Sequence, residues 1–431
     1  MPRNVRIHDA RLTLVMAACL VITFAFMVLP SSAARADEDL AGEKYRQKQR
    51  EMVQAVRDIR TNLLTEEVVN EFKRVERQFN GVIASGTKER GPGFKVLQAG
   101  LRYRVYSAAD PARQTAVGME TVLKNLDRNL HSAGQAINDR QEKQRFRTLV
   151  CRETLSLLRE LLDNDFDARS FAIGILPELE TSTSRDRRLE IHDDVDEVLT
   201  EILADPDQPD AVKVRAAQSI TLYLEKYDPG TQVEMSFARA VRAQLSNPNT
   251  DVAYQYFLLN ALARIRAGRE AVGTPRRATV IETLSAVLQD QRRQMLVRCR
   301  AAGALGEVGY DQQIRFEPIA WKVAQLGVEA AVQYNASPND PDWAECGERL
   351  FLAFHHEDRD RRDGPNPQGF LNRIPESELV RGAYAQLLPI AAKMTFGQNV
   401  PEKAIVSAHR WVKENTPDDL KFGPYADPLM P

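Results

Sequence analysis

The sequence predicts an all-α protein built as an α-solenoid, a row of stacked helix pairs with a helical region at each end. Three observations lead to this prediction. Apolar residues recur at three- to five-residue steps over residues 51–84, which is the spacing of one helix face. Four helix pairs follow one another at a near-constant step from about residue 146 onward. A short polar turn separates the two helices of each pair.

Residues 1–36 are typical of an export signal. A basic start precedes an apolar run over residues 12–29, and small residues at Ala34 and Ala36 suit a cleavage site. This pattern predicts cleavage after Ala36, which would give a mature protein that begins at Asp37 and is periplasmic or secreted. The apolar run is 18 residues long, just enough to span a bilayer, so an uncleaved membrane anchor is the alternative.

The charge balance argues against nucleic acid as a partner. The chain has 58 basic and 60 acidic residues, of which four and one lie in residues 1–36, leaving 54 and 59, or a net charge of −5. Such a balance gives no general attraction to phosphates. No other stretch of the sequence has membrane-spanning length, so no membrane contact is predicted after cleavage.

The cysteines predict ordinary buried thiols. Cys151, Cys299 and Cys346 remain after cleavage, and no CxxC or zinc-ligand spacing occurs. A sparse, odd set is no disulfide framework and gives no support to haem attachment or structural zinc. No cofactor is predicted.

Residues 37–145 form an N-terminal helical region in this prediction. Helical periodicity covers residues 51–84 and 110–137, with Asp110 as the N-cap and Pro111 at the first helical position of the second segment. Residues 94–108 alternate apolar side chains with arginines, as a strand would, and are predicted helical from their surroundings.

Residues 146–355 form the repeat region. The second helices align at equivalent positions 44, 42 and 43 residues apart, namely Leu176, Ile220, Leu262 and Leu305. Polar turns at residues 163–167, 205–210, 246–251 and 289–294 lie between the first and second helices. A fifth pair follows over residues 318–334 and 342–354.

The segment 297–309 predicts a helix with two packing faces. At 100° per residue its large apolar side chains share one side, together with Ala301 and Ala304. The opposite side holds Cys299, Ala302, Gly303 and Gly306. A glycine inside a helix costs about 1 kcal/mol relative to alanine, so close packing against another helix is expected to offset this cost. Gly309 suits a left-handed position past the helix end.

This segment, "VRCRAAGALGEVG", resembles a HEAT repeat of the degenerate HEAT-like, or phycobilisome-lyase-like, kind. The resemblance covers residues 146–355, and only the fourth unit matches closely. Lys213 stands where the basic residue of the pattern belongs, and the third unit has Tyr254 and Gln255 in place of Val-Arg.

The resemblance implies a non-catalytic protein-binding or scaffolding role, because such arrays present long surfaces to other proteins. In the family the second helices commonly line the concave side. The polar residues that this implies as contacts for a protein partner are Lys213, Arg215, Gln255, Arg298 and Arg300.

Two features suggest other functions. His355 and His356, followed by Glu357 and Asp358, are candidate metal ligands, and an enzyme or metal-binding protein with a site there is the competing prediction; the HExxH spacing is absent. Four arginine pairs could also bind an acidic partner, although neighbouring aspartates favour local neutralisation. These pairs are Arg187-Arg188, Arg276-Arg277, Arg292-Arg293 and Arg361-Arg362.

Residues 356–431 close the chain. Two further helices are predicted over residues 378–394 and 401–415, the second beginning at Pro401. The last sixteen residues hold four prolines, so an irregular tail is expected.

Overall fold

The computed structural model describes residues 63–182, 190–265, 279–308, 314–355 and 369–418. These residues belong to one compact unit of the chain, residues 59–431. They form helices and, apart from one antiparallel bridge between Glu180 and Ile191, no β-structure. The predicted all-α class is therefore confirmed for this part of the chain.

The predicted export signal, residues 1–36, lies outside the described residues. Among the helices that the structure does describe, none combines the length and the apolar character needed to cross a membrane.

The N-terminal region begins with α3 (Glu66–Ser85) and α4 (Pro92–Tyr106), which pack against each other. Helix α4 confirms the helical prediction for the ambiguous segment 94–108. Leu97, Leu101 and Val105 lie on one side of α4 and are fully buried, so packing against neighbouring helices overrides the alternating pattern.

The helix predicted to start at Asp110 begins later, and that prediction is wrong in its boundary. Asp110 does act as a cap, but of a short 3₁₀ turn, η2 (Pro111–Arg113), whose Ala112 N–H it accepts at 3.0 Å. The α-helix, α5 (Ala116–Ser132), starts after a second cap, Thr115. Two capping residues compete within six positions, and the second one begins the longer helix.

The predicted helix pairs are present. The first helices are α6 (Arg140–Leu161), α8 (Val195–Ala204), α10 (Thr231–Leu245), α12 (Thr279–Gln289) and α14 (Glu317–Ala336). The second helices are α7 (Phe166–Ile175), α9 (Asp210–Lys226), α11 (Val252–Ala263), α13 (Met295–Glu307) and α15 (Asp342–Phe354). Helix α6 starts before residue 146, and α7 gives way to a 3₁₀ turn, η3 (Leu176–Glu178), at Pro177.

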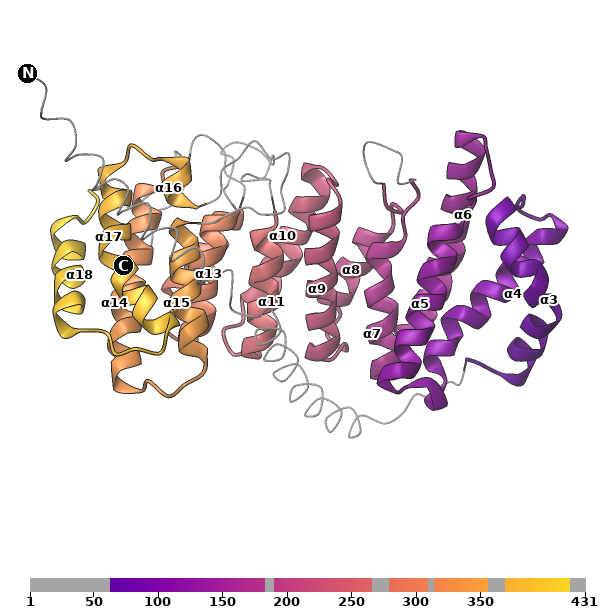
Figure 1. The fold of residues 1–431 in the computed structure, drawn as a ribbon, viewed down its shortest axis with the longest axis horizontal. Helices are drawn as coiled ribbons and strands as arrows, with labels where there is room; N and C mark the ends of the chain where they lie inside the picture. The colour runs from indigo at the N-terminus through magenta and orange to yellow at the C-terminus, as the bar shows by residue number, and fades with distance from the viewer. Residues whose placement is uncertain (1–62, 183–189, 266–278, 309–313, 356–368, 419–431) are drawn as a thin grey trace, which may run out of the picture. The chain divides into compact units, whose positions relative to one another are not determined.

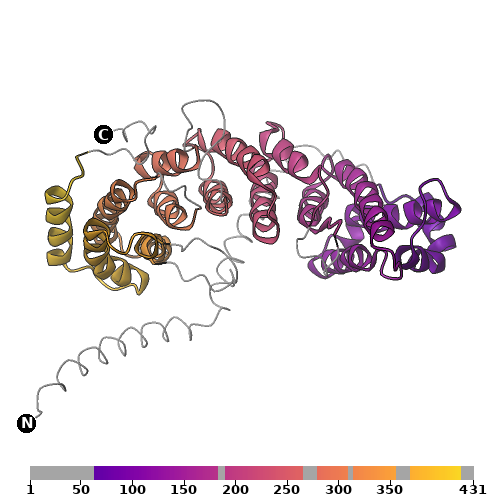
Figure 2. The same ribbon diagram turned by 90° about the horizontal axis from the view of Figure 1, so that it is seen from above.

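Consecutive helices pack in order along the chain (Figures 1 and 2). Each pair α8 with α9, α10 with α11 and α12 with α13 is in contact. First helices also contact first helices, from α8 to α10 to α12, while second helices contact second helices from α7 through α9, α11 and α13 to α15. This two-layer packing is consistent with a helical repeat.

Two of the four predicted polar turns supply side-chain helix caps, whereas Pro209 and Gln294, the N-caps of α9 and α13, make no side-chain cap bond. Asp165 accepts the Ala168 N–H at 3.0 Å at the start of α7. Asp251 does the same for Ala253 at 2.8 Å at the start of α11. Each cap satisfies a backbone donor that the first helical turn leaves unpaired.

The two-faced packing predicted for α13 is confirmed on its small-residue side. A Cβ placed on Gly306 would lie 2.5 Å from the carbonyl oxygen of Ala353 in α15. A Cβ on Gly303 would lie 3.3 Å from the Arg349 carbonyl oxygen in the same helix. The glycines therefore let the backbones of α13 and α15 approach closely. Gly309 lies outside the described residues.

The C-terminal part comprises α16 (Phe370–Arg373), α17 (Glu378–Thr395) and α18 (Glu402–Glu414). Helix α17 packs on α14 and α15, and α18 packs on α14 and α17. Both predicted C-terminal helices are present, and Pro401 is the N-cap of α18 rather than its first residue.

Candidate functional site

The five residues for which partner contact is predicted lie on α9, α11 and α13. Arg215 is exposed, whereas the other four are buried, with Gln255 and Arg300 at only 2% exposure. The contact role of these residues stays a prediction. Polar and charged side chains are buried where they are paired. We therefore expect the four buried side chains to contact other parts of this chain.

Gln255 holds the turn between α10 and α11. Its side-chain amide donates to the carbonyl oxygens of Pro248 at 3.1 Å and Thr250 at 2.8 Å. Arg293 of the following turn donates both to Gln255 and to the Leu245 carbonyl. Gln255 and Arg293 therefore join two successive turns by hydrogen bonds that water cannot replace in the interior.

Arg298 joins three helices. Its Nε donates to the Leu288 carbonyl at the end of α12 at 2.8 Å, and its Nη2 contacts Glu329 of α14 at 2.7 Å. A cation at a helix C-terminus also interacts favourably with the helix dipole. Arg298 thus joins α13, a second helix, to the first helices α12 and α14.

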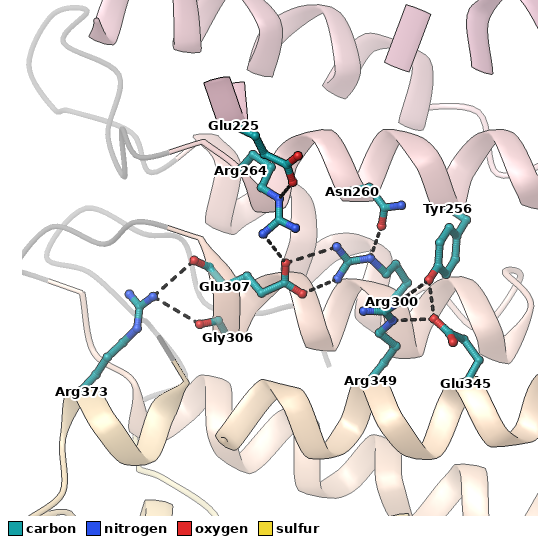
Figure 3. Close-up of polar contacts among 10 residues, drawn as sticks. All are labelled: Glu225, Tyr256, Asn260, Arg264, Arg300, Gly306, Glu307, Glu345, Arg349 and Arg373. Atoms are coloured by element: carbon teal, nitrogen blue, oxygen red, sulfur yellow. Dashed lines mark hydrogen bonds and ion pairs between the residues drawn. The ribbon is translucent and has the colours of Figure 1, made fainter. Parts of the chain in front are cut away.

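A polar cluster of the second-helix layer centres on Glu307 at the end of α13 (Figure 3). Arg300, two turns earlier on the same face of α13, contacts Glu307 at 2.9 Å and also donates to Asn260 of α11. Arg264, the C-cap residue of α11, contacts Glu307 at 3.3 Å and Glu225 of α9 at 2.7 Å. The side chains of Arg300 and Glu307 are 3% and 2% exposed, so this ion pair lies in the interior.

A second group of contacts bridges α11 and α15 beside this ion pair (Figure 3). Tyr256 donates its hydroxyl hydrogen to Glu345, and Arg349 donates to the same hydroxyl at 2.7 Å. Arg349 also contacts Glu345 at 2.6 Å. Because Gly303 has no side chain, Arg349 can lie along α13 and reach α11. We call the residues of these two groups the polar network.

Arg373 of α16 closes the C-terminal end of α13 (Figure 3). Its Nη2 donates to the carbonyl oxygens of Gly306 at 3.2 Å and Val308 at 2.8 Å. The Gly369 N–H donates to Gly306 as well, at 2.9 Å. These bonds satisfy carbonyl groups that the last turn of a helix leaves unpaired.

Two groups of the polar network, Tyr256 and Arg349, have shifted pKa values. Burial raises the pKa of Tyr256, which keeps the phenol neutral and able to donate to Glu345. Burial alone lowers the pKa of Arg349, but the neighbouring Tyr256 and Glu345 outweigh burial and raise it. The network is therefore a clamp between α9, α11, α13 and α15, with its charges directed at one another.

The metal-site prediction rests on residues that the structure describes only in part. His355 follows α15 and stacks on Phe351, with ring centroids 5.7 Å apart. His356, Glu357 and Asp358 lie outside the described residues, so the site stays a prediction. Elsewhere in the described ranges, no three His, Cys, Asp or Glu side chains gather closely enough to hold a metal ion.

Of the four arginine pairs, only Arg292-Arg293 lies in the part of the chain that the structure describes. Arg292 contacts Asp290 at 2.8 Å, and Arg293 is buried. Local neutralisation by a neighbouring aspartate is confirmed for this pair.

One pocket of about 300 Å³ lies between α14 and α18. Trp321, Val328, His409 and Val412 line it, and the Trp321 indole donates to the Val412 carbonyl at 2.9 Å. The surface of this pocket is mainly apolar, in contrast to the charged side chains of the polar network.

The three cysteines in the described residues are buried free thiols, as predicted. The Cys151 thiol contacts the carbonyl oxygen of Glu180 at 3.5 Å. Burial raises the pKa of Cys151 to about 12, although Arg147 nearby lowers it.

This burial predicts a slow, pH-dependent reaction of Cys151 with iodoacetamide in the folded protein. With a pKa of about 12, only roughly one thiol in ten thousand is ionised at pH 8, and the thiolate is the nucleophile. The labelling rate should rise about tenfold per pH unit between pH 8 and pH 10, because each unit deprotonates ten times more thiol. Mass spectrometry of a peptide containing Cys151 measures this rate. Labelling as fast as that of a small free thiol would contradict the burial.

Comparison of the chain with protein-family models, with characterised proteins and with solved structures gives no match. The HEAT-like resemblance therefore rests on the residues quoted for it.

Sequence reasoning missed the polar network. Tyr256 and Arg349 lie 93 residues apart, and Tyr256 and Glu345 lie 89 apart, so no local spacing brings them together. The one signal in the sequence is the pair of glycines in α13, which predicts close approach of another helix but not which charges lie beside it.

Proposed function

We propose that this protein is an exported, non-catalytic binding or scaffolding protein whose helix pairs form a HEAT-like α-solenoid. The observation that carries the proposal is the unbroken packing of second helices from α7 to α15. Helices packed side by side in this way offer one extended surface, and a protein partner can contact several units at once. The polar network supports the proposal because it stiffens this layer, and a preorganised surface loses less entropy on binding.

The side chains left at least partly exposed on the second helices suit a protein partner. Arg215 and Leu222 of α9 are exposed, and Phe257 of α11 and Leu352 of α15 are half-buried. Arg215 and Phe257 occupy equivalent repeat positions, and so do Leu222 and Leu352. We call these four residues the second-helix surface. Arginine and aromatic side chains surrounded by apolar ones are frequent centres of binding energy at protein interfaces.

Two substitutions test this proposal. Arg215→Glu combined with Phe257→Asp should lose a protein that the unchanged chain captures from the native cell envelope, because the charge is reversed and the aromatic contact removed. A loss of at least tenfold in recovered partner is expected for contacts of this kind. Quantitative mass spectrometry of the captured proteins gives the readout.

Val117→Asp provides the matched control, since Val117 is 74% exposed on α5 and lies outside the second-helix surface. Capture should be unchanged by this control. Equal capture by all three proteins contradicts the proposed surface. Recovery of no partner, together with a stoichiometric metal ion in the purified protein, favours the competing site near His355 and His356.

Export is tested by N-terminal sequencing of the protein from its native source. A start at Asp37 supports cleavage after Ala36. Retention of residues 12–29 in a membrane fraction favours the membrane-anchored adaptor instead.

A further inference from the structure

Two cysteines lie on the facing sides of the closest helix contact described above. Gly306 of α13 meets Ala353 of α15 so closely that a Cβ on Gly306 would lie 2.6 Å from the Ala353 Cα. Cys299 and Cys346 each lie seven residues, or about two helical turns, before these contact residues. Residues two turns apart share a helix face, so both cysteines lie on the faces that touch.

A second pair of residues shows how the two helices are aligned. One turn before Gly306, Gly303 lies against Arg349, with 3.3 Å between its ideal Cβ and the Arg349 carbonyl oxygen. The two helices therefore run in the same direction with a fixed offset, and this offset places Cys299 opposite Cys346.

The register brings the two thiols together inside the protein. The neighbouring Cys299 thiol and burial raise the pKa of Cys346. The two residues are 0% and 1% exposed. Cys151, in contrast, contacts a backbone carbonyl of Glu180, in another part of the fold.

We propose that Cys299 and Cys346 form a disulfide bond under oxidising conditions and so join the fourth and fifth helix pairs covalently. The oxidant is a disulfide compound, such as glutathione disulfide or a dithiol–disulfide oxidase. Two S–H groups lose two protons and two electrons as the new S–S bond forms, and the oxidant's S–S bond is reduced to two thiols. In the cell this step rests on the proposed export, because disulfides persist in oxidising compartments.

Burial determines when the bond forms. A neutral thiol shielded from solvent reacts slowly, so exchange takes place during folding or when the contact between α13 and α15 opens. Once formed, the bond links residues that are 47 positions apart in the sequence and limits the conformations of the unfolded chain.

The test is refolding of the full-length protein in a glutathione redox buffer, followed by acid quenching, maleimide labelling in denaturant and proteolysis. We expect a linked peptide pair containing Cys299 and Cys346, while Cys151 is labelled by maleimide. Cys299→Ser and Cys346→Ser should each lose the linked pair, and Cys151→Ser should retain it. The oxidised protein should unfold at a temperature roughly 5–10 °C above that of the reduced protein, and Cys299→Ser should abolish this difference.

Maleimide labelling of both Cys299 and Cys346 without prior reduction would overturn the proposal, as would glutathione attached to either residue in place of the linked pair. These outcomes are independent of partner capture. Failure of the disulfide therefore leaves the binding role standing, and failure of capture leaves the disulfide standing.

Discussion

Gly306→Ala is expected to destabilise the protein by about 2 kcal/mol, although alanine is the better helix former. The new methyl group would lie 2.5 Å from the Ala353 carbonyl oxygen and 2.6 Å from its Cα, and backbone atoms cannot rotate away as a flexible side chain can. Helices α13 and α15 must move apart, which costs more than the roughly 1 kcal/mol that alanine contributes to the helix. Denaturant unfolding followed by circular dichroism measures the difference.

Gly81→Ala is the matched control for this substitution. Gly81 also lies inside a helix, α3, but a Cβ there meets no atom within 4 Å. This change should stabilise the protein by up to about 1 kcal/mol. Gly303→Leu should destabilise it, since the larger side chain must displace Arg349. If Gly306→Ala stabilised the protein as much as Gly81→Ala does, the close contact between α13 and α15 would be absent.

Glu307→Ala is expected to lower the free energy of unfolding by about 3–5 kcal/mol, the cost of leaving a buried charge without its partner. Arg300, with a side chain 3% exposed, would lose its carboxylate, and Arg264 would lose one of two. Arg300→Met combined with Glu307→Leu should lose less than Glu307→Ala alone, because no unpaired charge remains on α13. Equilibrium unfolding in urea gives the free energy of unfolding of the unchanged protein, of Glu307→Ala and of the double variant.

Glu120→Gln serves as the control for the charge change. Glu120 forms an ion pair with Lys124 on α5, and its side chain is 57% exposed. Exposed pairs of this kind contribute less than about 1 kcal/mol, so this substitution should have little effect. A Glu307→Ala protein as stable as Glu120→Gln would show that the polar network contributes nothing to the fold.

Local patterns in the sequence predict most of the fold. The helix pairs, their polar turns and the caps at Asp165 and Asp251 depend on residues within one or two helical turns of each other, and such signals are readable in a single sequence. The start of the helix near Asp110 could not be predicted in this way. Two capping residues, Asp110 and Thr115, lie close together, and the sequence does not show which of them begins the longer helix.

The candidate site depends on contacts between distant segments, and these the sequence does not reveal. Arg298 and Arg300 look like surface residues, because arginine is usually exposed. Arg298 is paired with Glu329 of α14, and Arg300 is paired with Glu307, which is itself buried. The spacing of nearby residues in the sequence does not reveal that these groups are buried. The glycines of α13 are the exception, because a glycine inside a helix implies a close neighbour.

The second helices pack side by side, with α13 in contact with both α11 and α15. Hydrogen exchange of the folded protein, followed by mass spectrometry, is the measurement that tests this packing. We predict that the amides of α13 exchange among the slowest of the described helices, and that Gly306→Ala speeds exchange in α13 and α15 while leaving α3 unchanged. Exchange in α13 as fast as in the half-exposed α18, or an unaltered pattern in Gly306→Ala, would contradict it.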